Sequence, residues 1–204
     1  MYADMLAEGL GDKAKTGDYA RHIGREADRL SRVVTNVMSY SRLERGELEV
    51  RRAPGDLVAA VRDSVEALRP ALEGAGATVR FSATGSVSEL VFDRDAVFQI
   101  VQNLVDNAEK HTRSVTDRSI EVGVHAENGS AAITVTDHGP GVPPRLRGSL
   151  FEPFFRGSSP DAPAGLGLGL TLVRALTVAH GGLVRYDDRE GGGARFTVLL
   201  PSRV

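Results

Sequence analysis

The sequence contains no cysteine, which excludes disulfide bonds, zinc–thiolate sites and thiol catalysis and fits a reducing cytosol. It also lacks a run of about 18 apolar residues and a charged-then-apolar leader, so we expect neither a membrane span nor a secretion signal. Neither charge is in clear excess, because 25 basic and 27 acidic residues leave a formal charge of -2. The composition therefore shows no excess of positive charge of the kind that indicates binding to nucleic acid or to an anionic membrane surface.

Lysine is scarce, since only Lys13, Lys15 and Lys110 occur among the 25 basic residues. The chain has 204 residues, of which 41% are hydrophobic, and this suffices for one core of ordinary domain size and a smaller attached element. We therefore expect one domain with an appendage. Lys110 is the one lysine outside the N-terminal region, which makes it a candidate functional residue.

The N-terminal region is predicted to be helical. Residues 17–45 contain no proline, and apolar or small residues recur at alternating spacings of four and three, at Ile23, Ala27, Leu30, Val34, Val37 and Ser41. This spacing is typical of a coiled-coil or bundle seam, with a helix packed on its own domain as the alternative. Residues 1–10 are interpreted as the end of another helix and 11–16 as a polar loop, which predicts an antiparallel hairpin with a truncated first arm.

Beyond Gly46, strand and helix patterns are mixed. Short alternating or β-branched runs predict strands at 47–51, 77–82, 88–92, 119–126, 131–137, 183–187 and 195–200. Helices are predicted at 55–74, beginning near Asp56, at 95–112, and at 167–180 before two glycines. The order predicts an α+β fold, a two-layer α/β sandwich in which helices cover a mixed sheet. We expect residues 1–46 to form the hairpin remnant and 47–204 the domain.

A segment rich in glycine, proline and serine joins the strand at 131–137 to the last helix. It has about 28 residues, and a loop of that length inside a compact domain is usually a functional lid or is disordered. Within it, residues 151–156 hold three phenylalanines and Arg156, and aromatic side chains in a mobile loop are expected to dock elsewhere. We expect residues 142–164 to be mobile until a ligand orders them.

Polar residues follow one face of the helix predicted at 95–112. Asn103, Asn107 and Lys110 recur at i, i+4 and i+7, among apolar neighbours. Two amide oxygens and an ammonium group suit a magnesium-bound polyphosphate, because amide oxygens are hard ligands and lysine is a point charge for phosphate. A merely solvated helix face would show the same spacing.

Two glycine motifs lie on either side of the long segment. Asp137 ends a β-branched strand before Gly139 and Gly141, where glycine permits close backbone approach and a buried carboxylate can accept a hydrogen bond from an amine such as that of adenine. The other motif opens the last helix with Gly165, Gly167 and Gly169. Exposed amides at such a helix start favour an anion, although the spacing matches neither a Walker loop nor the dinucleotide fingerprint.

The order of these motifs resembles the catalytic, ATP-binding domain of sensor histidine kinases, within the superfamily that also holds gyrase-type, Hsp90-type and MutL-type ATPases. Residues 88–200 carry the resemblance. Residues 103–110 are similar to the N box, 137–141 to the G1 box, 151–156 to the F box, 165–169 to the G2 box and 191–196 to the final glycine box.

The resemblance implies roles at the matching positions. Asn107, helped by Asn103, would hold Mg²⁺, Lys110 and His111 would face the phosphates, and Asp137 would bind the adenine amine of ATP. The further nucleotide-binding positions would be Gly139, Gly141, Gly165, Gly167 and Gly169. Asn103, Lys110 and Arg156 would be catalytic. Leu166 departs from the threonine or serine often found there in the family, so backbone amides would have to replace its hydroxyl contact to phosphate.

The N-terminal helix also resembles the family, in the second helix of its dimerisation and phosphoacceptor domain. The implied function is ATP-dependent phosphorylation of a histidine in a two-component system, in the cytoplasm, with a homodimer through the hairpin and a response regulator receiver domain as partner. The parent protein could be membrane-anchored through upstream segments. The family's His-Glu-x-x-x-Pro acceptor string occurs nowhere in the sequence, so we expect no autophosphorylation. The expected roles of His22, His125, His138 and His180 are packing or surface ones.

Three alternatives remain beside this interpretation. A conformational ATPase of the gyrase or Hsp90 kind would need a carboxylate to activate water where this sequence has Asn103, and an amide cannot take a proton. An anti-sigma-type serine kinase is disfavoured by the same asparagine and by the helical hairpin. The last alternative is a nucleotide-gated dimerisation module without kinase activity of its own.

Overall fold

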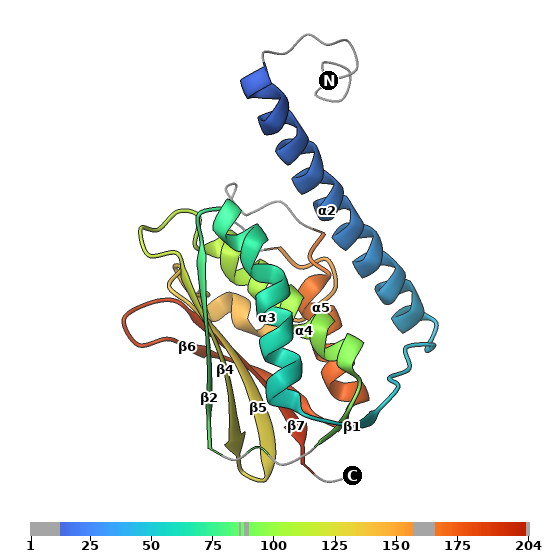
Figure 1. Cartoon of the computed structure of the whole chain (residues 1–204). Helices are drawn as coiled ribbons and strands as arrows, with labels where there is room; N and C mark the ends of the chain where they lie inside the picture. The colour runs from blue at the N-terminus through green and yellow to red at the C-terminus, as the bar shows by residue number, and fades with distance from the viewer. Residues whose placement is uncertain (1–12, 86, 88–89, 157–165, 203–204) are drawn as a thin grey trace.

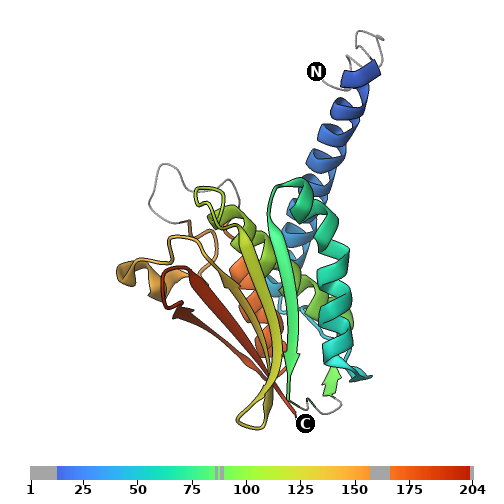
Figure 2. The same ribbon diagram turned by 60° about the vertical axis from the view of Figure 1, so that its left-hand side comes forward.

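The computed structural model describes residues 13–85, 87, 90–156 and 166–202. Its helices are α2 (Lys13–Glu44), α3 (Leu57–Gly74), α4 (Arg94–His111) and α5 (Gly169–Ala179), with a short 3-10 helix η1 (Pro144–Ser149). Its strands are β1 (Ala53–Gly55), β2 (Thr78–Thr84), β3 (Leu90–Phe92), β4 (Ser119–Glu127), β5 (Ser130–Asp137), β6 (Leu183–Asp188) and β7 (Ala194–Pro201). Figures 1 and 2 show a twisted sheet with α3, α4 and α5 on one of its faces, which confirms the predicted two-layer sandwich.

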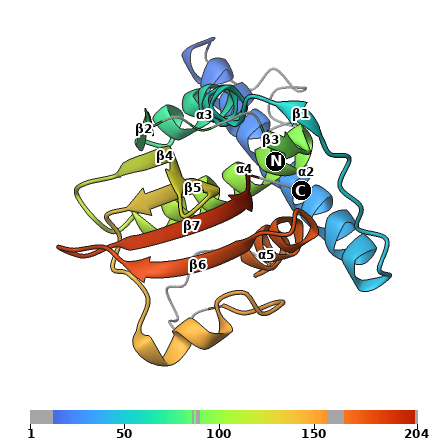
Figure 3. The same cartoon turned by 90° about the horizontal axis from the view of Figure 1, so that it is seen from below.

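The main sheet has five strands in the order β2-β4-β5-β7-β6, with β6 at one edge (Figure 3). β2 and β4 are parallel, and the other neighbouring pairs are antiparallel. β4 and β5 are joined by Asn128 and Gly129, both with positive φ, as a type I′ hairpin turn requires. A separate antiparallel pair, β1 and β3, lies near the start of α4. The sheet is therefore mixed, as predicted.

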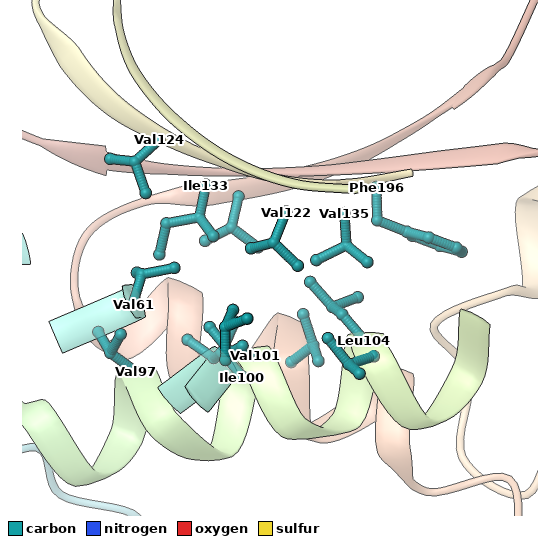
Figure 4. Close-up of a cluster of buried hydrophobic side chains, with 14 of the residues drawn as sticks. Val61, Val97, Ile100, Val101, Leu104, Val122, Val124, Ile133, Val135 and Phe196 are labelled. Carbon is teal, nitrogen blue, oxygen red and sulfur yellow. The ribbon is translucent and has the colours of Figure 1, made fainter. Parts of the chain in front are cut away.

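The core lies between the sheet and the three helices (Figure 4). Apolar side chains of one sheet face meet those of α4, which contributes Val97, Ile100, Val101 and Leu104, all fully buried. The sheet contributes Val122, Val124, Ile133, Val135 and Phe196. Truncation of a large side chain here to alanine would cost about 2–5 kcal/mol. This packing fixes the inner face of α4 and leaves its other face available for polar side chains.

The ends of the helices are fixed by specific hydrogen bonds. The Asp56 carboxylate accepts from the Ala59 amide at 3.0 Å and caps α3, as the sequence predicted. Asp93 caps α4 by accepting from the amides of Asp95 and Ala96. The buried His180, just after α5, accepts from the Asp93 amide at 3.0 Å and so joins the end of α5 to the start of α4.

The structure corrects three local predictions. Residues 47–51 form no strand, and the short strand β1 follows them because residues 53–55 pair with β3. Lys13–Thr16, expected in a loop, belong to α2 because no proline interrupts the helix between residues 13 and 44. Residues 144–149 form η1 within the segment expected to be irregular, with a proline at the start of the helix where its missing amide hydrogen costs nothing. Residues 1–12, with the expected first arm, lie outside the described ranges.

Helix α2 lies against the helical layer, and its N-terminal end extends beyond the domain (Figure 1). Of the predicted seam, Leu30, Val34 and Val37 are 63%, 59% and 43% exposed, so this stripe faces away from the domain. Met38 is exposed on the same helix. Within the described ranges, no helix combines the length and apolarity needed to cross a membrane.

Candidate active site

The candidate residues meet at one end of the sandwich. α4 supplies Asn103, Asn107 and Lys110 from its C-terminal half, β5 ends in Asp137, and Gly169 begins α5. A Cβ atom on Gly169 would lie 3.0 Å from Oδ1 of Asn103, which shows how closely α5 begins beside α4. Residues separated by more than 60 positions are thus brought together by the α4–α5 packing and by the pairing of β5 with β7.

Asp137 is 2% exposed and held rigidly by the main chain. Its Oδ1 accepts from the amide of Gly139 at 2.8 Å and from that of Ala194 at 3.2 Å. No described residue forms a hydrogen bond with Oδ2, so this oxygen can accept from a ligand. Burial raises the pKa of Asp137, and the two backbone hydrogen bonds and His111 oppose that rise in part. The group is a buried acceptor in a fixed orientation, as the adenine-amine role requires.

Glycines allow the loops around Asp137 to approach each other. A Cβ atom on Gly139 would lie 2.9 Å from the carbonyl oxygen of His111, so the loop of the G1 box, residues 137–141, lies directly against the end of α4. Gly141 has a φ of +71° and lies against Gly193. A Cβ on Gly193 would overlap the main-chain carbonyl of Asp137. The predicted G1 box and the final glycine box therefore form one tightly packed unit.

Asn103 and Asn107 differ in their surroundings. Asn103 is 8% exposed, and its amide donates to the Gln99 carbonyl at 2.9 Å while its Oδ1 accepts from the side chain of Asn36 at 3.0 Å. Asn107 is half-buried, and none of the described residues bonds to its side chain. The amide oxygen of Asn107 is thus free for a ligand, whereas that of Asn103 is occupied by a donor from α2.

Lys110 is half-buried one turn beyond Asn107. Burial lowers the pKa of Lys110, and the neighbouring Asp106 opposes that shift. Desolvation also lowers the pKa of His111 at the end of the helix. A bound polyanion would favour the charged form of both side chains, because an opposite charge offsets the cost of burial. Their positions suit the phosphate roles that the sequence predicts for them.

The start of α5 has the features of an anion site. Leu168 precedes the helix without a side-chain cap, so the first amides of α5 have no side-chain acceptor there. Gly167 has a φ of +70°, and a Cβ on it would lie 2.6 Å from the Phe155 carbonyl oxygen. The Thr171 hydroxyl, in the first turn of α5, is buried without a hydrogen-bond partner among the described residues. Gly165 lies outside the described ranges.

The aromatic motif is divided between the core and α2. Phe151 and Phe155 pack against the core, as expected for docked aromatics, and Phe151 meets Phe196 edge to face at 6.3 Å. Phe154 is instead 59% exposed with a φ of +59°, and its ring lies 5.4 Å from that of Tyr40 on α2. Arg156 is exposed at the end of the described segment.

Sequence reasoning missed two groups of residues at this site. Arg32, Asn36, Ser39 and Tyr40 reach the site from α2, and the first three recur at spacings of four and three on a second face of that helix. That polar spacing was a usable signal. The second group anchors the lid: the Tyr186 hydroxyl accepts from the Val142 amide at 3.0 Å and donates to Asp188 at 2.7 Å, and Arg147 pairs with the same carboxylate. Local sequence gave no sign of this group.

The donor set fits a magnesium ion that arrives with a nucleotide. Within the described ranges there is no cluster of three or more histidine, cysteine, aspartate or glutamate side chains that could hold a metal. Two amide oxygens alone make an incomplete set for Mg²⁺, which usually keeps waters and takes phosphate oxygens as its other ligands. Asn107, with Asn103 beside it, fits such a shared site.

Comparison with known proteins agrees with this geometry. Residues 92–204 match the family of histidine kinase-, DNA gyrase B- and HSP90-like ATPases. The histidine-protein kinase/phosphatase MprB of Mycobacterium avium is 32% identical over 187 residues, covering 87% of this chain and 34% of MprB. The histidine protein kinase DivJ of Caulobacter vibrioides is 33% identical over 185 residues, 90% of this chain and 31% of DivJ. The chain thus spans about a third of the length of each relative.

A solved structure shows the same arrangement over nearly the whole chain. Full-length ShkA in complex with AMPPNP matches with a TM-score of 0.74 and 27% identity, covering 98% of this chain and 42% of ShkA. The chain therefore belongs to the histidine kinase-, DNA gyrase B- and HSP90-like ATPase family, and its domain is the ATP-binding domain of a sensor histidine kinase.

Proposed function

We propose that the chain binds Mg-ATP and donates its γ-phosphoryl group to a histidine that is not among its own residues. The observation that carries this proposal is that Asp137, a buried hydrogen-bond acceptor, lies beside the end of α4, the helix that carries Asn107 and Lys110. The gyrase-type alternative needs a carboxylate at position 103, and the structure has an amide there. ShkA, which is similar in fold, was solved with AMPPNP, and this supports nucleotide binding here.

In the proposed reaction an imidazole nitrogen of the acceptor attacks the γ-phosphorus, and a P–N bond forms as the bond to the β–γ bridging oxygen breaks. ADP leaves with the electron pair of that bond, and the other ring nitrogen of the acceptor, which carries the N–H, releases its proton so that the phosphorylated imidazole is neutral. Asp137 would orient the adenine ring. Lys110 and the first amides of α5 would neutralise the phosphate oxygens. Asn103 and Asn107 would hold the metal. Bound Mg²⁺ supplies charge neutralisation at the phosphates. The chain thus contributes positioning and electrostatics.

The remaining assignments follow from the family and are part of the same proposal. We infer a homodimer through the helical hairpin, a response regulator receiver domain as downstream partner and a cytoplasmic setting. Residues 1–46 would belong to the dimerisation region and 47–204 to the ATP-binding domain. Arg156 would act from the lid. The exposed stripe of Leu30, Val34 and Val37 supports the dimer, because an isolated chain leaves it uncovered.

The test uses labelled ATP and two proteins. The chain is incubated alone, and then with an acceptor protein that carries a phosphoacceptor helix and has its own nucleotide site inactivated. We expect acid-labile label on the acceptor only, at a slow rate because no tether raises the local acceptor concentration. Label on the chain alone would show that one of its own residues, such as His22, accepts the group. Nucleotide binding without label on either protein would favour the nucleotide-gated dimerisation module.

A further inference from the structure

Helix α2 covers part of the ligand face of α4 through three side-chain contacts. Ser39 accepts from the Gln99 amide at 3.0 Å, Asn36 donates to Asn103 at 3.0 Å, and Arg32 pairs with Asp106 at 3.1 Å. We call these three pairs the polar zipper. The two helices run antiparallel along it, since 39, 36 and 32 meet 99, 103 and 106 in turn. Its members on α4 share the face that carries the candidate metal and phosphate ligands.

The central pair of the polar zipper occupies one of the two lone pairs on the amide oxygen of Asn103. The amide nitrogen of Asn103 is bound to the Gln99 carbonyl, so its orientation is fixed, and Oδ1 receives the Asn36 N–H. An amide hydrogen carries partial positive charge, so the Asn36 N–H disfavours the approach of a cation to the same oxygen. The side chain of Asn107 has no hydrogen-bond partner among the described residues, so a metal can reach Asn107 without any change, whereas Asn103 becomes a better ligand when Asn36 withdraws.

A fourth contact links α2 to the lid. Tyr40, one turn beyond Asn36, meets Phe154 edge to face at 5.4 Å. Phe154 has a φ of +59°, a left-handed conformation that is costly for a bulky residue and persists where its surroundings hold it. On its other side, the main chain of Phe154 packs against Gly167 before α5. Docking of α2 is therefore coupled to the backbone that closes the phosphate end of the site.

The polar zipper has the character of a reversible contact. The Arg32 and Asp106 side chains are 33% and 25% exposed, and an ion pair that remains accessible to water contributes little to the stability of the contact. Burial raises the pKa of Asp106, and Arg32 opposes that rise most strongly. The apolar stripe of α2, by contrast, takes no part in the contact and is exposed. The helix also packs against α5, but none of its described side chains belongs to the hydrophobic core, so it can leave α4 without uncovering that core.

We propose that α2 and magnesium nucleotide compete for Asn103, and that Asn36 is the positioning residue that sets this competition. With α2 docked, Asn36 holds the amide oxygen and the nucleotide binds without the full metal contribution. With α2 withdrawn, Asn103 joins Asn107 at the metal, and Phe154 is released with Tyr40. This inference rests on the proposed binding of Mg-ATP and adds a residue outside the ATP-binding domain that controls it.

The first test exploits the absence of cysteine in the chain. Ser39→Cys combined with Gln99→Cys places two thiols on the polar zipper, and a short bismaleimide crosslinker, which spans the length lost from the Gln99 side chain, should join them in the absence of nucleotide. We expect AMPPNP with magnesium to reduce the crosslinking rate several-fold, and AMPPNP with EDTA to reduce it much less. The control pair, Ser39→Cys with Asp63→Cys on the far helix α3, should crosslink slowly in all conditions. A rate that magnesium nucleotide leaves unchanged would overturn the competition.

The second test measures the ratio of the Kd for AMPPNP in EDTA to the Kd in magnesium. Asn36→Leu keeps the volume but removes the donor, so this ratio should rise about threefold to tenfold, the equivalent of one hydrogen bond. Thr35→Ala, at an exposed neighbouring position, should leave it unchanged. An effect on both Kd values alike would mark Asn36 as merely structural. Wild type that binds no nucleotide would refute the proposed function, whereas binding with an unaltered ratio in Asn36→Leu would refute the competition alone.

Discussion

At the residue scale, Asp137 is the side chain whose environment the fold determines most completely. Two main-chain amides bind one oxygen and leave the other to a ligand. Asp137→Asn keeps the shape but turns part of the acceptor into a donor. We expect ADP affinity to fall about 10- to 100-fold, the range of a hydrogen bond to a charged group. Isothermal titration checks this, with the exposed Asp63→Asn as a control that should bind normally.

The raised pKa of Asp137 gives nucleotide binding a characteristic pH dependence. An adenine amine donates to the ionised carboxylate, so affinity should fall on acidification. Because burial raises the pKa, the fall should begin above the pH at which an ordinary aspartate, with a pKa of about 3.9, becomes protonated. Because the pKa of Asp137 is higher in the folded than in the unfolded state, the folded state binds the proton more tightly. The contribution of Asp137 to folding stability is therefore complete below its unfolded pKa and is lost as the pH rises through its folded pKa. Affinity that stays constant down to the ordinary aspartate range would contradict the assignment.

His180 illustrates a histidine whose role is structural. Its Nδ1 lies 2.7 Å from the Leu176 carbonyl, so that nitrogen donates, and Nε2 accepts from the Asp93 amide. His180→Ala leaves a buried amide and a buried carbonyl without these partners and should lower the free energy of unfolding by about 2 kcal/mol. Urea denaturation measures the loss. His125→Ala, at a half-exposed position, should lower the free energy of unfolding much less. Equal losses in the two variants would show that the hydrogen bonds of His180 contribute little.

At the element scale, the turn between β6 and β7 is fixed by its contact with the end of β5. Gly192 and Gly193 both have positive φ, of +96° and +113°, but only a Cβ on Gly193 would overlap the Asp137 carbonyl. Gly192→Ala should cost about 1–3 kcal/mol from backbone strain alone. Gly193→Ala should lower the unfolding free energy further and also weaken ADP binding, because the Asp137 main chain must move. Similar stability and binding in both variants would exclude the overlap.

The lid begins with a packed root, in which Tyr186, Asp188 and Arg147 hold residues 142–150 on the edge of the sheet. Tyr186→Phe removes both hydrogen bonds of the hydroxyl. We expect faster amide exchange at residues 142–150 and a few-fold loss of nucleotide affinity, since the G1 loop continues into this root. Hydrogen-exchange mass spectrometry measures the first effect. Glu190→Gln, at an exposed position in the same edge region, serves as a control that should leave residues 142–150 protected.

The expected mobility of residues 142–164 stays a prediction, and the structure describes only part of this segment. Residues 142–156 carry η1 and the docked Phe151 and Phe155, whereas 157–165 lie outside the described ranges. The anchoring side chains come from β6 and β7, and no local pattern in the lid could reveal them. Composition predicted a lid, and tertiary contacts decided which of its described residues pack against the domain.

At the scale of the whole molecule, α2 presents two faces. The polar zipper docks on α4, and the apolar stripe of Leu30, Val34, Val37 and Met38 is exposed, so docking leaves the surface for self-association open. We expect concentration-dependent dimerisation in sedimentation measurements. Val34→Asp should weaken it at least tenfold, because a charge in an apolar seam must be desolvated. The exposed Thr35→Asp, beside the stripe, should have a smaller effect, and equal effects would argue against this face.

The sequence by itself determined the fold class and singled out the candidate site residues. The α+β sandwich follows from hydrophobic periodicity, and Asn103, Asn107, Lys110 and Asp137 stand out because residue type and local spacing carry their chemistry. Helix ends shifted by only a few residues, since caps such as Asp56 are local signals. The strand expected at 47–51 failed because strand pairing depends on a distant partner, β3.

Only the tertiary structure decided which partners these residues have. Asn36 binds Asn103 across 67 positions, and Ala194 binds Asp137 across 57, so neither contact leaves a trace in local periodicity. Burial, which raises the pKa of Asp137 and lowers that of Lys110, depends likewise on packing of elements far apart in sequence. The chemistry of each group is thus encoded locally, but its availability to a ligand is set by long-range packing, because contact and desolvation arise only when the chain is folded.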